Sequence, residues 1–268
     1  MTHHLNIILV GHGAISGFVV DQIMPVYGIN IAALVCREGS FQQALEFADE
    51  RFPVVTSVNL LDPKPDLLVD CAGHSGLLCH APKALENGID VISISSGTLA
   101  QQGLADRLEE SARIGDARIR FLPGAVGGID ALTAAAAGEI DNVTYTARKP
   151  PESWAGSPAE KKCDLMNLEK PFEHFSGTAR EAALLYPKNA NVAATIAVAS
   201  IGLDKVLVKL IADPGVDKNI HKIEANGSFC RLSVRIEGNH MPGNPKSSAL
   251  AAMSIVGELK RRISRVGI

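Results

Sequence analysis

The sequence lacks the features that would place it in several specialised classes of protein. Its 268 residues carry a net charge of only −3, without the excess of Lys and Arg that binds nucleic acid or an anionic membrane surface. It contains no apolar run long enough to cross a bilayer and no signal-peptide pattern near Met1. These absences predict a cytoplasmic protein whose partners include neither nucleic acid nor a membrane.

Cysteine is also scarce, and no C-x-x-C spacing occurs among Cys36, Cys71, Cys79, Cys163 and Cys230. An odd number of unpaired cysteines predicts reduced, mostly buried thiols. Two of them lie near His74 and His80, but this spacing fits no zinc pattern, and adjacent helical residues point about 100° apart. We therefore predict no metal site.

What the sequence does contain is an apolar run, Leu5–Val10, followed by the turn GHGAIS at 11–16. The run is typical of a strand buried on both faces of a parallel sheet. In such a turn Gly11 permits the tight bend, Gly13 lets a pyrophosphate approach, and the helix that starts at Ala14 and Ile15 offers free N–H groups. Ser16 stands where a third glycine or an alanine is usual, and it is small enough to fit. The turn predicts dinucleotide binding; the alternative is a plain strand–turn–helix.

Strands and helices alternate over the first half of the chain. The expected strands are Leu5–Val10, Ile31–Val35, Leu67–Cys71, Asp90–Ile94 and Arg118–Leu122, and the expected helices are Ala14–Met24, Gln42–Arg51, Leu77–Glu86 and Leu104–Arg113. This alternation predicts an α/β fold with a doubly wound parallel sheet of the Rossmann type. Ligands of such sheets bind at the carboxyl ends of the strands. The segments expected at that edge are Gly11–Ser16, Cys36–Arg37, Ala72–His74, Ser95–Gly97 and Pro123–Gly128.

Two residues at that edge have open roles. The second strand ends in Cys36-Arg37-Glu38, without an acidic residue directly at its end to bind the ribose hydroxyls of NAD. Arg37 either receives the 2′-phosphate of NADP or is an ordinary surface arginine, so the cofactor is NAD or NADP. His74 lies either near the nicotinamide or simply in a loop.

The second half of the chain has a different character. Three glycines in Gly124–Gly128 require unusual backbone angles or a close approach to a ligand. We expect a helix at Ile129–Ala137, a half-buried strand at Val143–Ala147 and loop with short helices over 151–175. A buried helix is expected within Val192–Ile211, then strands that start at His221 and Cys230, and a last helix after Pro245. We expect a dinucleotide-binding domain of residues 1–124 plus 245–268, on which the last helix packs, and a smaller α/β domain with an open-faced sheet at 125–244.

Two residues of the second half are candidates for function. His221 shares a strand face with Ile223 and Ala225, so it is either a hydrogen-bonded core histidine or a proton-transfer group. Asn191 either caps the helix that follows or projects its amide toward a ligand.

Taken together, these motifs resemble the L-aspartate dehydrogenase family over nearly the whole chain. The resemblance rests on GHGAIS (11–16), ISISSGTLA (92–100), LPGAVGGIDAL (122–132), TARKPP (146–151), PKNANVAATIAVA (187–199), DPGVDKNIHKI (213–223) and GNPKSS (243–248). It implies that Ala125 and Asn191 contact the nicotinamide cofactor and that His221 is catalytic. It also implies a homodimer, with the smaller domain supplying the substrate site and the dimer contacts.

The implied reaction is NAD(P)-dependent oxidation of L-aspartate to iminoaspartate, which water hydrolyses to oxaloacetate and ammonia, together with the reverse reductive amination. Hydride leaves Cα only when the nitrogen has a free lone pair, so we expect a histidine of near-neutral pKa to take the ammonium proton. Candidates for binding the substrate carboxylates are Arg148, Lys149, Lys188 and Lys246, which the sequence does not rank. The product feeds NAD biosynthesis or aspartate breakdown. Alternatives are a reductase of homoserine-dehydrogenase or dihydrodipicolinate-reductase type, or a non-catalytic NAD(P)H sensor.

Overall fold

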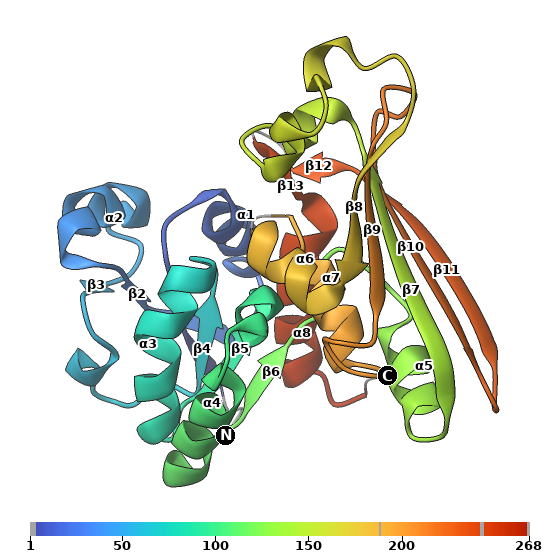
Figure 1. The fold of residues 1–268 in the computed structure, drawn as a ribbon. Coiled ribbons are helices and arrows are strands. Elements are labelled where there is room, and N and C mark those ends of the chain that lie inside the picture. The colour runs from blue at the N-terminus through green and yellow to red at the C-terminus, as the bar shows by residue number, and fades with distance from the viewer. Residues whose placement is uncertain (1–3, 188, 242–243, 267–268) are drawn as a thin grey trace. The chain divides into compact units, whose positions relative to one another are not determined.

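The computed structural model describes residues 4–187, 189–241 and 244–266, and the chain divides into two compact units (Figure 1). Unit 1 comprises Met1–Ser95, Gly103–Leu122 and Ala252–Ile268. Unit 2 comprises Ser96–Gln102 and Pro123–Ala251. The division differs from the expected domains because residues 96–102, 123–124 and 245–251 belong to the second unit rather than the first.

Unit 1 is built on a six-stranded parallel sheet, which confirms the expected fold class. The strands are ordered β3-β2-β1-β4-β5-β6, with bounds β1 (Leu5–Val10), β2 (Ile29–Val35), β3 (Val54–Val55), β4 (Leu67–Asp70), β5 (Asp90–Ser93) and β6 (Ile119–Phe121). Strand β3 was not expected from the sequence. Ile7 and Leu9 of β1 are fully buried, as the apolar run predicted.

Five helices accompany this sheet: α1 (Ala14–Ile23), α2 (Phe41–Ala48), α3 (His74–Glu86), α4 (Leu104–Gly115) and α8 (Ala249–Ile263). The last helix, from Ala252 onward, belongs to unit 1, although the unit 2 stretch Pro123–Ala251 directly precedes it in the chain. Its residues Ile255, Val256 and Leu259 join the same hydrophobic core as β1. The expected packing of the last helix on the first domain is therefore confirmed.

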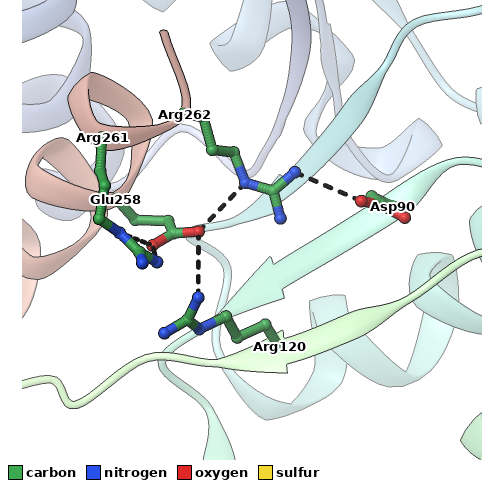
Figure 2. Close-up of polar contacts among 5 residues, drawn as sticks. All are labelled: Asp90, Arg120, Glu258, Arg261 and Arg262. Atoms are coloured by element: carbon green, nitrogen blue, oxygen red, sulfur yellow. Dashed lines mark hydrogen bonds and ion pairs between the residues drawn. The ribbon is translucent and has the colours of Figure 1, made fainter. Parts of the chain in front are cut away.

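Glu258 attaches the polar side of α8 to this unit (Figure 2). Its carboxylate, 7% exposed, accepts hydrogen bonds from Arg261 and Arg262 of its own helix and lies 3.8 Å from Arg120 of β6. Arg262 in turn lies 3.3 Å from Asp90 of β5. Burial alone would raise the pKa of Glu258, but the hydrogen bonds from the two helical arginines and the charge of Arg120 keep it lowered.

Unit 2 contains a five-stranded mixed sheet in the order β11-β10-β7-β9-β8. Its elements are β7 (Ile140–Lys149), β8 (Phe172–Thr178), β9 (Leu207–Ala212), β10 (Asn219–Gly227), β11 (Arg231–Gly238), the hairpin strands β12 (His240–Met241) and β13 (Asn244–Ser248), and helices α5 (Ile129–Ala136), α6 (Ala179–Leu185) and α7 (Asn191–Val198). β7 and β9 are parallel, and the other neighbouring pairs are antiparallel.

Two expectations for this unit were only partly right, because each of the stretches concerned has the expected helices and also contains part of a strand. The stretch 151–175 does contain three short 3-10 turns, but β8 begins within it at Phe172. The helix expected within Val192–Ile211 ends at Val198, and β9 occupies the end of that segment. β9 lies between β7 and β8 and pairs with both. These pairings hold residues 207–212 in an extended conformation, which the local apolar pattern of the segment does not predict.

The two faces of this sheet differ in polarity. Val143, Tyr145 and Ala147 of β7 belong to a core that residues of helices α6 and α7 help to form. The two helices lie on one side of the strands (Figure 1). The alternate residues, such as Thr146, Lys222 and Arg235, are half-exposed or exposed. The expected open-faced sheet is thus present. Within the described ranges, no helix is long and apolar enough to span a membrane.

Candidate active-site residues

The glycine turn of unit 1 borders a pocket at the carboxyl ends of β1, β2 and β4. The pocket lining includes Gly11, Gly13, Arg37 and Ala72. Gly11 has φ +89°, and a Cβ built on it would lie 2.7 Å from Cβ of Ala72. Only glycine fits there, because any side chain would be strained and would clash.

The start of α1 supplies donors beside this turn. Gly13 is the N-cap, with no atom within 4 Å of a built Cβ, and Ala14 and Ile15 form the first turn, whose N–H groups lack partners within the helix. Ser16, which stands where a third glycine is usual, donates from Oγ to the carbonyl of Gly11 at 2.6 Å. This hydrogen bond joins the two ends of the glycine turn. Nδ1 of His12 is buried and has no hydrogen-bond partner in the part of the chain that the structure describes. A backbone open to approach and rich in donors fits a dinucleotide phosphate.

The rest of the pocket comes from the end of β2 and the start of α3. Arg37 is exposed and lines the pocket together with Ser40, and the lining contains no Asp or Glu. His74 is the first residue of α3 rather than a loop residue. All five cysteines are free thiols, but only Cys36 and Cys71 are buried, so the expectation of mostly buried thiols was wrong. The described residues contain no group of three or more potential metal ligands.

Asp70, which sequence analysis did not select, organises the end of β4 in the same unit. Its buried carboxylate accepts from Oγ of Ser93 at 2.6 Å and Oγ of Ser95 at 2.7 Å. Burial raises its pKa, and the two serine hydrogen bonds oppose that rise. The serines of ISISSGTLA therefore tie β5 to β4.

In unit 2, the glycine-rich segment before α5 has the unusual backbone predicted for it. Gly124 and Gly128 have φ of +67° and +72°, and a Cβ on Gly128 would lie 2.8 Å from the side chain of Val234. Ala125 lies between these glycines, is 6% exposed, and joins the core of unit 2.

Asn191 is the first residue of α7 and does not act as its N-cap, which is Ala190. Its side-chain Oδ1 accepts from the backbone N–H of Gly97 at 3.1 Å, and its carbonyl accepts from Oγ of Ser96 at 2.8 Å. Asn191 thus fixes Ser96 and Gly97 within unit 2.

His221 lies on the core face of β10, 3% exposed, as its position beside Ile223 and Ala225 predicted. Nδ1 is 2.7 Å from the hydroxyl of Tyr145 on β7, and the two rings are nearly parallel, at 7°. The antiparallel register explains the contact, because His221 pairs with Ala147, two residues from Tyr145 on the same face. The alternating pattern of the strand predicted Tyr145 on this buried face but indicated no function for it.

The pKa of His221 is not near neutral, contrary to expectation. Burial, and then the positive charge of Lys149, lower it to about 3. His174 of β8 behaves similarly, since burial and the charges of Lys162 and Lys149 lower its pKa to about 4. Both imidazoles are therefore neutral at pH 7. Burial raises the pKa of Tyr145, so its hydroxyl keeps its proton.

The structure describes two of the four candidate carboxylate ligands, and they differ. Arg148 is already paired with Asp213 at 2.6 Å. Lys149 is 6% exposed, with its ammonium 5.0 Å from the centre of the Trp154 ring. Lys188 and the side chain of Lys246 lie outside the described residues.

Comparison with known proteins decides the family. A family model described as "Aspartate dehydrogenase, C-terminal" matches residues 130–262, and one described as "Homoserine dehydrogenase, NAD binding domain" matches 11–122. L-aspartate dehydrogenase of Ruegeria pomeroyi is 48% identical over 96% of this chain and 92% of its own. The chain belongs to the aspartate dehydrogenase family. The enzyme of the same name from Pseudomonas aeruginosa is 44% identical over 98% of this chain and 100% of its own length.

A solved structure agrees with the fold. Aspartate dehydrogenase from Thermotoga maritima matches 99% of this chain and 100% of its own with a TM-score of 0.79 at 24% identity. The match to the aspartate dehydrogenase C-terminal model covers the half that carries His221, which disfavours the homoserine-dehydrogenase and dihydrodipicolinate-reductase alternatives.

Proposed function

We propose that the chain is an NAD(P)-dependent L-aspartate dehydrogenase that oxidises L-aspartate to iminoaspartate and catalyses the reverse reductive amination. The observation that carries this proposal is the buried His221–Tyr145 pair in the half of the chain that matches the aspartate dehydrogenase C-terminal family. The relatives named above carry the same activity in their names. A sensor without turnover would not need a buried imidazole held by a hydroxyl.

The proposed work of His221 is proton transfer at Nε2. The imidazole takes a proton from the substrate ammonium, which leaves the nitrogen lone pair free as hydride departs from Cα, and it returns the proton in the reverse direction. For Nε2 to be the basic atom, Nδ1 must carry the hydrogen and donate it to the Tyr145 oxygen. Aspartate brings two carboxylates whose negative charge raises the pKa of an adjacent imidazole from its low starting value.

The nicotinamide cofactor, when bound, supplies the hydride acceptor for oxidation and the hydride donor for amination. Gly11, Gly13, Ala14 and Ile15 of unit 1 would hold its phosphates through the open turn and the free N–H groups of α1. The cofactor is NAD or NADP. Two features support NADP: Arg37 would receive its 2′-phosphate, and the described residues that line the pocket include no carboxylate to bind the ribose hydroxyls of NAD. Ala125 and Asn191 of unit 2 would contact the nicotinamide end.

Two further properties belong to the proposal. The enzyme is a cytoplasmic homodimer: the free thiols support a reducing compartment, and the half-exposed polar face of the unit 2 sheet supports a partner subunit. Its iminoaspartate either feeds NAD biosynthesis or hydrolyses to oxaloacetate and ammonia. Light scattering on the purified protein would show a mass of one chain if the homodimer is wrong.

The test of the activity is NAD(P)H oxidation at 340 nm with oxaloacetate and ammonium, run with each cofactor and repeated without ammonium. Turnover that requires ammonium supports amino-acid dehydrogenation and shows which cofactor is preferred. Turnover that persists without ammonium would identify a keto-acid reductase instead. Absence of turnover combined with saturable quenching of NAD(P)H fluorescence would favour the sensor.

A further inference from the structure

Lys149, the last residue of β7, is a buried cation with no ion-pair partner among the residues that the structure describes. Its backbone is fixed, because its carbonyl accepts from the N–H of Asp213 at 2.9 Å and two prolines follow it in the chain. Its ammonium faces the ring of Trp154, which is itself anchored through Nε1 to the carbonyl of Ile211 at 3.2 Å. Within the described ranges, no carboxylate forms an ion pair with Lys149.

An arrangement of this kind is costly for the protein alone. A buried ammonium that lacks an anionic partner costs several kcal/mol in lost hydration, and an aromatic ring returns only about 2 kcal/mol or less of that. Burial lowers the pKa of Lys149 to about 8, so the group still carries its charge at pH 7. The neighbouring Arg148 shows the contrast: it points to the other side of β7 and its charge is already neutralised by Asp213. Lys149 therefore retains its capacity to bind an anion.

A second unsatisfied group lies beside it. The register that pairs Ile220 with Arg148 sets Asn219 opposite Lys149, at the end of the two strands. Asn219 is 3% exposed, and its side-chain Oδ1 has no hydrogen-bond partner among the described residues. Because side chains alternate along a strand, Asn219 lies on the same face of β10 as His221. Burial of two incompletely satisfied polar groups next to the proposed proton acceptor indicates that a ligand completes them.

We propose that Lys149 binds a carboxylate of the substrate and that the Asn219 amide hydrogen-bonds to the same molecule. The inference rests on the proposed function for the identity of the substrate, a four-carbon dicarboxylate with an amino or keto group. Lys149 supplies the charge, Asn219 the orientation, and His221 faces the nitrogen that loses the proton. A substrate with only one carboxylate would leave one cation of the substrate site, either Lys149 or another of the four candidates named above, without an anionic partner.

The test replaces Lys149 by Met, which has nearly the same length and packs on Trp154 without charge. We expect Lys149→Met to raise KM for both aspartate and oxaloacetate about 30-fold or more, since one partner of a buried charge pair is lost. Lys149→Arg, which keeps the charge, should recover part of this loss. Lys205→Met serves as the matched control because Lys205 is an exposed lysine of the same unit. The affinity for NAD(P)H should be the same in all four proteins.

Thermal unfolding separates binding from a structural role. Removing a buried charge without a counter-ion should leave the Tm of Lys149→Met equal to or above that of the wild type. A lysine that only stabilises the fold would instead give a lower Tm with an unchanged KM. That result, or a rise in KM no larger than the one in Lys205→Met, would overturn the assignment.

Binding of succinate, an unreactive four-carbon dicarboxylate, keeps this proposal separate from the proposed activity. Calorimetry should show succinate binding to the wild type and Lys205→Met, weaker binding to Asn219→Ala, and none to Lys149→Met. If the wild type binds succinate through Lys149 but does not turn over aspartate, the activity is wrong and the site stands. If Lys149→Met binds succinate as the wild type does, the site is wrong.

Discussion

The hydroxyl of Tyr145 lies 2.7 Å from Nδ1 of His221 and influences which ring nitrogen carries the proton. In the imidazolium, both nitrogens are donors, and the Tyr145 oxygen is the acceptor for one of them. A hydrogen bond to the charged form is stronger than one to the neutral form. Tyr145 is accordingly a positioning residue that stabilises the protonated state formed during turnover.

Replacing Tyr145 by Phe should lower kcat about 10- to 100-fold, which corresponds to the loss of one hydrogen bond to a charged group. KM for aspartate should change little, because the ring that packs in the core is retained. The acid side of the kcat–pH profile should move to lower pH, since the imidazolium is less stable without its acceptor. Steady-state kinetics over pH 6–10 check this, and an unchanged profile would show that Tyr145 only packs.

Two buried histidines predict how stability depends on pH. The folded-state pKa values of His221 and His174 are about 3 and about 4, below the value near 6.5 of an unfolded chain. Below pH 6.5 the unfolded state therefore binds protons that the folded state does not, so stability falls as the pH falls. Each histidine contributes up to about 1.4 kcal/mol per pH unit between its two pKa values.

Urea unfolding between pH 7 and pH 5 measures this slope. The free energy of unfolding should drop toward pH 5, and His174→Gln should reduce the slope by about the share of one histidine. Lys149, whose pKa burial lowers only to about 8, stays largely protonated over this range and adds little to the slope. A wild-type stability that is flat from pH 7 to pH 5 would contradict the assigned burial of both neutral rings.

At the scale of elements, Glu258 connects α8 to β6 through arginine side chains (Figure 2). Glu258→Gln keeps the shape and removes the charge, which should destabilise the protein by about 1–3 kcal/mol. The loss of stability is smaller than for a fully buried ion pair, because the side chains of Arg120, Arg261 and Arg262 are partly exposed and water can solvate their charges. Glu110→Gln is the control, because Glu110 pairs with Arg113 at an exposed site of α4. Equal denaturant midpoints for the two variants would show that Glu258 does not anchor α8.

Most elements of unit 1, though not the two-residue strand β3, could be predicted from the sequence because their signals are local. An apolar run such as Leu5–Val10 and a turn such as Gly11–Gly13 identify their structure without reference to distant residues. β8 and β9 could not be predicted in this way, since each is extended only because it pairs with strands far away in the sequence. The roles of Tyr145 and Asn219 could not be predicted either, because they depend on the register of β7 against β10, which local sequence patterns do not give. The low pKa of His221 likewise follows from tertiary burial, which its strand pattern did not quantify.

At the scale of the whole molecule, the proposed chemistry divides between the two units. The phosphate-binding turn lies in unit 1, and the proposed proton acceptor, with Lys149 and Asn219, lies in unit 2. A substitution in unit 2 at the histidine should therefore impair the chemical step and leave the phosphate contacts of the cofactor intact. This separation makes the central claim, that His221 moves the substrate proton, directly testable.

The measurement is kcat for aspartate oxidation by His221→Ala, with NAD(P)H affinity from fluorescence quenching measured on the same preparation. Loss of a general base should lower kcat about 10²- to 10⁴-fold, and the affinity for NAD(P)H should remain that of the wild type. A variant that keeps the wild-type kcat across the pH range would show that His221 is a core histidine and that another group takes the proton.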